Sequence, residues 1–296
     1  MIDPNKDPMI SADDLLKVLV LKETGANQFS GISKTIGSDT VFGGQVLAQA
    51  LNAAYRTIKS KRILHSMHAY FLEAGNLDLP INYDVTILRD GGSFSSRRVT
   101  AIQNGTVIFI LAASFHKKEE GYEHQIEFPK NIKPPEELAS WDDILEQFGS
   151  MLPKKLKHFL EIPRPIIFKP LESPNPFDKK DLPPANAVWF KLKGNVAALD
   201  LAVKQQILTY ISDYNILTVA INVHASKAHW GNTITASLDH SMWYFRDFDF
   251  DDWMLYALET PSTSNARGFA RGNIFTRKGE LIASVAQEGL MRPMVK

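Results

Sequence analysis

The stretch His65-Ser-Met-His-Ala-Tyr-Phe71 returns about 175 residues later as His240-Ser-Met-Trp-Tyr-Phe245. Both copies follow an apolar helical pattern and precede an Arg-bearing strand, a glycine turn and a last apolar strand. A shared tripeptide can arise by chance, but an ordered set of features at one offset indicates a duplicated domain.

The helical patterns define the core of each copy. Residues 41–55 are rich in Ala and Leu, and residues 199–211 repeat their spacing; the apolar positions are Leu47, Ala50, Leu51, Ala54, Leu199, Val203, Ile207, Tyr210 and Ile211. Each set lies on one face of a helix. The pairs Asn104-Gly105 and Lys278-Gly279 are typical of hairpin turns. We therefore predict an α+β fold of two tandem hotdog domains, each a long helix wrapped by a curved antiparallel sheet.

Proline marks the segment between the copies. Eleven of the sixteen prolines fall between Pro129 and Pro184, where neither a long helix nor continuous sheet is favoured. Short helices are expected at 136–148 and 154–160. We predict an N-terminal hotdog domain over 1–118, a Pro-rich connecting segment over 119–186 and a C-terminal hotdog domain over 187–296.

Composition excludes several classes of protein. The 296 residues are 44% hydrophobic, enough for a large core, and carry 33 basic and 33 acidic side chains. This balance argues against a nucleic-acid partner. Cysteine is absent, so disulfides and thiolate chemistry are excluded. No apolar run approaches the roughly 20 residues that span a bilayer, and neither end carries a targeting signal. We expect a soluble cytoplasmic protein with no membrane partner.

Four longer strings resemble the acyl-coenzyme A thioesterase II family: Val41-Phe-Gly-Gly-Gln-Val-Leu-Ala-Gln-Ala-Leu, Leu88-Arg-Asp-Gly-Gly-Ser-Phe-Ser-Ser-Arg-Arg-Val, Asp239-His-Ser-Met-Trp and Gln287-Glu-Gly-Leu-Met-Arg292. The resemblance implies a double hotdog that hydrolyses fatty acyl-CoA to free acid and coenzyme A. It also implies a water activated by Asp213, Ser237 and Gln287, with Ser standing where many members have Thr. No cofactor and no metal are implied. Hotdog surfaces commonly pair, so a homo-oligomer, dimer or tetramer, is expected.

The three residues fit this chemistry to different degrees. Asp213 ends the second helical pattern, where the negative end of the helix dipole should raise the pKa of its carboxyl and suit it to be a general base. A solvated helix-end Asp is the alternative. Gln287 is in phase with apolar residues of its strand, so it needs buried partners, and a structural amide is the alternative. Ser237 lies three residues before His240, so the two should face opposite sides of a strand.

The first copy serves as an internal control. Aligning the glycine turns places Ala113 opposite Gln287, and aligning the histidines places Arg62 opposite Ser237. No acidic residue occurs between Thr40 and Leu72 to match Asp213. We therefore expect one active site per chain, in the second half.

Two other functions stay open. A hotdog dehydratase acting on 3-hydroxyacyl thioesters would use His240 with an acidic partner, and a non-catalytic module would bind acyl-CoA without turnover. The small residues Gly43 and Gly44 could leave the N-terminus of a helix open to an anion or a carbonyl group. Close contact between helix and sheet explains them equally well. Four arginines could meet the phosphates of coenzyme A, although solvated strand positions explain them more simply: Arg97, Arg98, Arg267 and Arg271.

Overall fold

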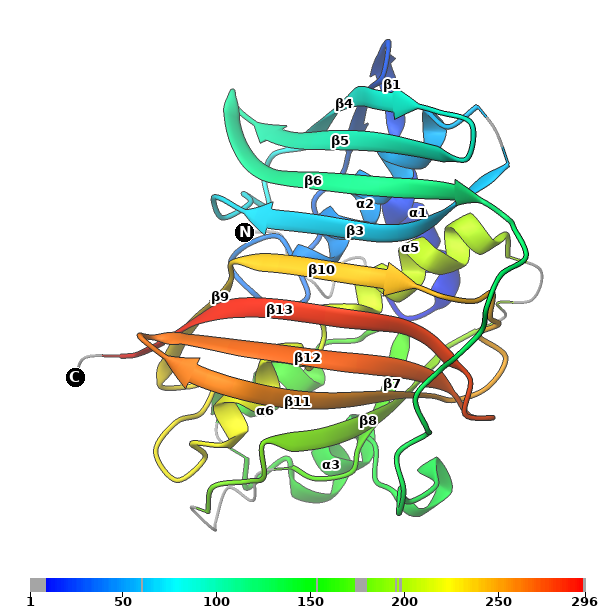
Figure 1. Ribbon diagram of the computed structural model, residues 1–296. Coiled ribbons are helices and arrows are strands. Elements are labelled where there is room, and N and C mark those ends of the chain that lie inside the picture. The colour runs from blue at the N-terminus through cyan, green and yellow to red at the C-terminus, as the bar shows by residue number, and fades with distance from the viewer. Residues whose placement is uncertain are drawn as a thin grey trace.

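The computed structural model describes residues 9–59, 61–152, 154–173, 180–194, 196 and 199–294. Its strands form one antiparallel sheet, and helices lie behind that sheet (Figure 1). No helix within these residues is long and apolar enough to cross a membrane.

The first half of the sheet comes from the N-terminal part of the chain. In spatial order it runs β1 (Lys22–Gly25), β2 (Gln28–Gly31), β4 (Ile81–Asp90), β5 (Phe94–Gln103), β6 (Thr106–Lys117) and β3 (Arg62–Phe71). Two helices accompany it, α1 (Ala12–Leu19) and α2 (Gly43–Arg56). The β5–β6 hairpin turns at Asn104-Gly105, both at positive φ, as the sequence predicted.

The second half has the corresponding strands in the reverse spatial order, from the centre of the sheet to its other edge. It runs β10 (Asp239–Tyr244), β13 (Leu281–Pro293), β12 (Arg267–Thr276), β11 (Met254–Ser264), β8 (Ala185–Leu192) and β7 (Ile166–Pro170), with β9 (Thr233–Ser237) also paired to β13. Its helices are α5 (Leu201–Ser212) and α6 (Ile216–Asn222). The two tandem hotdog domains predicted from sequence are thus confirmed.

The repeated strands themselves join the halves. β3 and β10 are antiparallel neighbours at the centre of the sheet, and Met67 pairs with Met242 (Figure 1). These methionines hold the same place in the two His-Ser-Met copies. A residue that pairs with its own counterpart marks a local two-fold axis, as in a symmetric dimer. The fused chain therefore reproduces an interface between two identical domains.

The central helices pack against each other behind this axis. Asn52 of α2 donates to Gln206 of α5 over 3.0 Å, and Gln205 donates to the carbonyl of Leu64 on β3 over 2.9 Å. Buried side chains from both halves join in a large apolar cluster that includes Met67 and Met242. This common core holds the end of α5 against the start of α2.

The Pro-rich segment differs from expectation in one respect. The helix expected at 136–148 is split into a 3₁₀ turn (Pro135–Glu137) and α3 (Trp141–Phe148), while α4 (Lys154–Glu161) forms as expected. Ser140 explains the split because its hydroxyl caps α3 in a capping box with Asp143. The segment also supplies β7, which pairs with β8 at the sheet edge.

Candidate active site

Asp213 lies where the two central helices meet. It is the C-terminal cap of α5, as the sequence predicted, and it faces the beginning of α2. A Cβ on Gly43 would lie 2.7 Å from its Oδ2 atom, and a Cβ on Gly44 would lie 2.5 Å from the backbone oxygen of Tyr210. The double glycine is therefore required for the close approach of α2 to the end of α5.

The pKa of Asp213 is raised, and burial is the main cause. The charged form of His240, the Gln287 amide, the Gly44 N–H and the Ser237 hydroxyl each oppose the rise by stabilising the carboxylate. The sequence predicted the correct direction of this pKa shift, but it attributed the shift to the dipole of α5 and not to burial. The N-terminus of α2 faces the same carboxylate, so the two helix ends act on it in opposite senses.

Gln287 and Ser237 complete the predicted set. Gln287 projects from β13 and is almost fully buried, and its Nε2 donates to Ser237 Oγ on β9 over 2.9 Å. Ser237 pairs with Gly289, which lies two residues beyond Gln287 on β13, so the side chains of Ser237 and Gln287 lie next to each other. Asp213 and Ser237 are half-buried, whereas Gln287 is not exposed. The structure thus brings together all three residues, from a helix end and two strands.

His240 contradicts the prediction that it faces away from Ser237. The strand expected through both residues is interrupted at Leu238, which separates β9 from β10. Strict alternation fails across that break, and both side chains reach Gln287. His240 is fully buried, with its Nδ1 against Gln287 Oε1 and its Nε2 2.9 Å from Ser212 Oγ. The hydrolase interpretation of the sequence left His240 outside the site, and only the dehydratase alternative named it.

Among the residues that the structure describes, the first half has no equivalent group. Met67 pairs with Ala113 and Met242 with Val285, so Ala113 corresponds to Val285 and not to Gln287 as turn spacing suggested. The difference arises because the β5–β6 hairpin extends further beyond this pair than the β12–β13 hairpin does, so equal spacing from the glycine turns does not give equivalent positions. At the C-terminal cap of α2, Thr57 takes the place that Asp213 has at the cap of α5.

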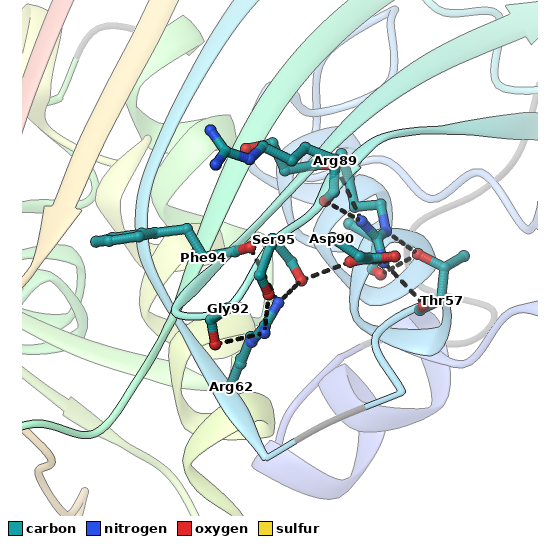
Figure 2. Close-up of polar contacts among 11 residues, drawn as sticks. Thr57, Arg62, Arg89, Asp90, Gly92, Phe94 and Ser95 are labelled. Carbon is teal, nitrogen blue, oxygen red and sulfur yellow. Dashed lines mark hydrogen bonds and ion pairs between the residues drawn. The ribbon is translucent and has the colours of Figure 1, made fainter.

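A buried arginine packs against Thr57 and Asp90, which Figure 2 shows close together. Arg97 of β5 donates from Nε to the Thr57 hydroxyl over 2.8 Å and from Nη2 to Asp90 over 2.9 Å. Only 1% of its side chain is exposed. Arg62, aligned with Ser237, donates to the backbone oxygens of Phe94 and Gly92 nearby. The first-half counterpart of the candidate site therefore contains guanidinium groups bound to the protein's own oxygens.

Two of the other arginines considered for phosphate binding have acidic partners. Arg267 pairs with Glu288 at 2.8 Å, and Arg271 pairs with Glu259 at 2.5 Å. Arg97 is buried, which corrects its interpretation as a solvated strand residue, whereas Arg98 is exposed. No cluster of three or more potential metal ligands occurs among the residues that the structure describes.

Replacing Arg97 with Met should destabilise the fold by about 1–3 kcal/mol, because it removes charge-assisted hydrogen bonds to Thr57 and Asp90. Activity per folded molecule should not change, since Arg97 lies in the half without Asp213. Urea denaturation measures the effect. Arg98→Met, an exposed change on the same strand, is the control, and equal stability of the two variants would contradict this assignment.

Comparison with known proteins agrees with the fold and with both halves of the chain. Residues 32–116 match the model of the acyl-CoA thioesterase N-terminal domain, and residues 156–290 match that of acyl-CoA thioesterase. Acyl-CoA thioesterase 2 of Haemophilus influenzae is 39% identical over 280 residues, which cover 95% of this chain and 97% of that one. Human acyl-coenzyme A thioesterase 8 is 34% identical, with 93% and 88% covered.

A solved structure gives the same result. The acyl-CoA thioesterase II of Mycobacterium marinum superposes with a TM-score of 0.76 at 33% identity, covering 94% of this chain and 97% of that one. Fold and relatives together define a double-hotdog thioester hydrolase. The chain belongs to the acyl-CoA thioesterase II family.

Proposed function

We propose that this protein hydrolyses fatty acyl-CoA to free fatty acid and coenzyme A, and that Asp213 activates the attacking water. The observation that carries the proposal is the meeting of three groups at the start of α2: a carboxylate with a raised pKa, a hydroxyl and a buried amide. The carboxylate suits a general base, and the other two groups can hold a water in one orientation.

The proposed reaction begins with a water held by Ser237 and Gln287. Asp213 takes a proton from this water while the water oxygen attacks the carbonyl carbon of the thioester. The positive end of the α2 dipole lies at this place and favours the negative charge that develops on the carbonyl oxygen. The intermediate then collapses with cleavage of the C–S bond. The leaving thiolate of coenzyme A receives the proton from Asp213, which restores the enzyme.

The surroundings of His240 favour hydrolysis over dehydration. A dehydratase needs a histidine nitrogen free to exchange a proton with substrate. His240 is fully buried, and its two ring nitrogens contact Gln287 and Ser212. It therefore supports the site from behind and is not placed to meet a substrate carbon.

The direct test is a free-thiol release assay on short, medium and long acyl-CoA substrates, with Gln287→Ala as the variant. We expect turnover by the wild type and a fall in kcat on the order of tenfold in the variant. The fall is smaller than for loss of an oxyanion-hole donor, because Asp213 and Ser237 still hold the water.

Gln103→Ala is the matched control, since Gln103 is also a buried strand amide but bonds the backbone of Asn76 and Leu79 in the first half. It should lower stability without lowering kcat per folded molecule. Tight binding of acyl-CoA without thiol release would contradict the proposal, and so would formation of an enoyl product.

A further inference from the structure

A chain of buried polar contacts runs behind the proposed water site. It begins at Ser212, the last residue of α5, passes through His240 on β10 and ends at Gln287 on β13. The contact from Ser212 Oγ to His240 Nε2 is 2.9 Å, and all three residues are buried. Because Asp213 follows Ser212 directly, the chain starts and ends beside the same carboxylate.

The orientation of the Gln287 amide follows from its neighbours. Its Nε2 group donates to Ser237 Oγ at 2.9 Å and stabilises the Asp213 carboxylate. The reversed amide would turn Oε1 toward that carboxylate, and two acceptors would repel each other. Oε1 therefore faces His240, so His240 must supply a hydrogen-bond donor.

His240 can meet Oε1 only as a donor. Its Nδ1 atom must therefore carry a proton. In the neutral ring Nε2 is then an acceptor, and the Ser212 hydroxyl beside it can turn its one proton either to Nε2 or to the carbonyl oxygen of Thr209, which lies 2.8 Å away. Burial lowers the pKa of His240 and so favours this neutral form. The contact with Gln287 Oε1 thus sets the ring tautomer, and the Nδ1 proton in turn holds the amide orientation.

We propose that His240 is a positioning residue for hydrolysis, which acts by holding the Gln287 amide with its NH₂ group toward Ser237 and Asp213. The proposal rests on the proposed function and deepens it by adding one residue to the water site. His240 does not touch the water in this arrangement, so its effect on rate passes entirely through Gln287.

The same motif position behaves differently in the first half. His65 is half-buried, and its Nε2 lies 2.8 Å from Ser114 Oγ while its ring contacts that of Phe94. The side chain on β6 that it meets is therefore a hydroxyl, whereas His240 meets an amide on β13. Conservation of His-Ser-Met between the copies does not by itself assign this role, but the contacts do.

Two substitutions separate positioning from packing. In His240→Asn the side-chain amide can place an N–H near the position of Nδ1, whereas in His240→Gln it reaches the position of Nε2. We expect His240→Asn to keep kcat within about threefold of wild type and His240→Gln to lose about tenfold, with little change in KM, because only Asn supplies the donor. The thermal transition of each variant reports its folding. Equal kcat values for the two folded variants would overturn the proposal.

A double-mutant cycle tests whether His240 acts through Gln287. Adding His240→Gln to Gln287→Ala should leave kcat unchanged, since the amide to be oriented is already gone. A further tenfold loss would overturn the proposal. The proposed function fails separately, when wild-type enzyme releases no thiol or when Asp213→Asn retains full turnover. If His240→Gln does not fold, retention of activity by His240→Asn supports the role and a tenfold loss there overturns it.

Discussion

Asp213→Asn should lower kcat on acyl-CoA by about 10²–10⁴-fold while the protein remains folded. The amide keeps the shape of the side chain but cannot accept the proton of the attacking water, and loss of a general base has this magnitude. The pH profile of the wild type should show the titration of Asp213, because activity falls on the acid side when this carboxylate is protonated. The fall should occur above the ordinary pKa of aspartate, since burial raises the pKa of Asp213. Steady-state thiol release over a range of pH measures both.

The same variant should be at least as stable as wild type at neutral pH. A raised pKa means that the folded protein binds more protons than the unfolded chain between the unfolded and folded pKa values, so stability falls as pH rises through that window. Asn removes this cost. Its advantage in Tm should therefore disappear at low pH, where Asp213 is protonated in both states.

Asp251→Asn, an exposed change on the loop before β11, is the control for both measurements. It should leave kcat unchanged and show no comparable gain in Tm at neutral pH. Turnover of Asp213→Asn at the wild-type rate would contradict the general-base role.

The sequence predicted the architecture well because periodicity is a local property. The helical spacing around Leu47 and Ile207, the glycine turns and the two His-Ser-Met strands each depend on near neighbours, and all of them recur in the structure. The position of Asp213 at the end of α5 followed from the same periodicity. The convergence of Asp213, Ser237 and Gln287 did not follow from spacing, and only the family resemblance indicated it.

Other features depend on long-range contacts that no local pattern reveals. The break at Leu238 turns His240 toward Gln287, and it arises because β9 and β10 both pair with β13 but in registers that differ by one residue. Arg97 lies on a strand whose neighbours include exposed residues, and its burial becomes apparent only when Thr57 at the end of α2 meets it. The interruption at Leu238 could have been suspected from the polar run Ser237 to Ser241, but not located.

Gly43→Ala should reduce kcat by about a hundredfold with little loss of stability. The new Cβ would lie 2.7 Å from Asp213 Oδ2 and 3.0 Å from the ring of Phe71, and such contacts must be relieved. The carboxylate is the end of a rotatable side chain, so it is the group that moves. A displacement of about 1 Å of a catalytic group costs on the order of 10² in rate. Alanine in the first turn of α2 is itself favourable by up to about 1 kcal/mol, which offsets the crowding.

Gly121→Ala is the matched control, because a Cβ there meets no atom within 4 Å. Gly44→Ala supplies the contrast: its Cβ would lie 2.5 Å from the backbone oxygen of Tyr210, which cannot rotate away, so α2 must shift from α5 and stability must fall. Thermal unfolding and thiol release on the three variants separate the two effects. If Gly43→Ala lost stability but kept kcat, the start of α2 would serve packing alone. A selective loss of kcat would instead indicate that the first glycine of the pair leaves room for the catalytic carboxylate, while the second lets the two helices touch.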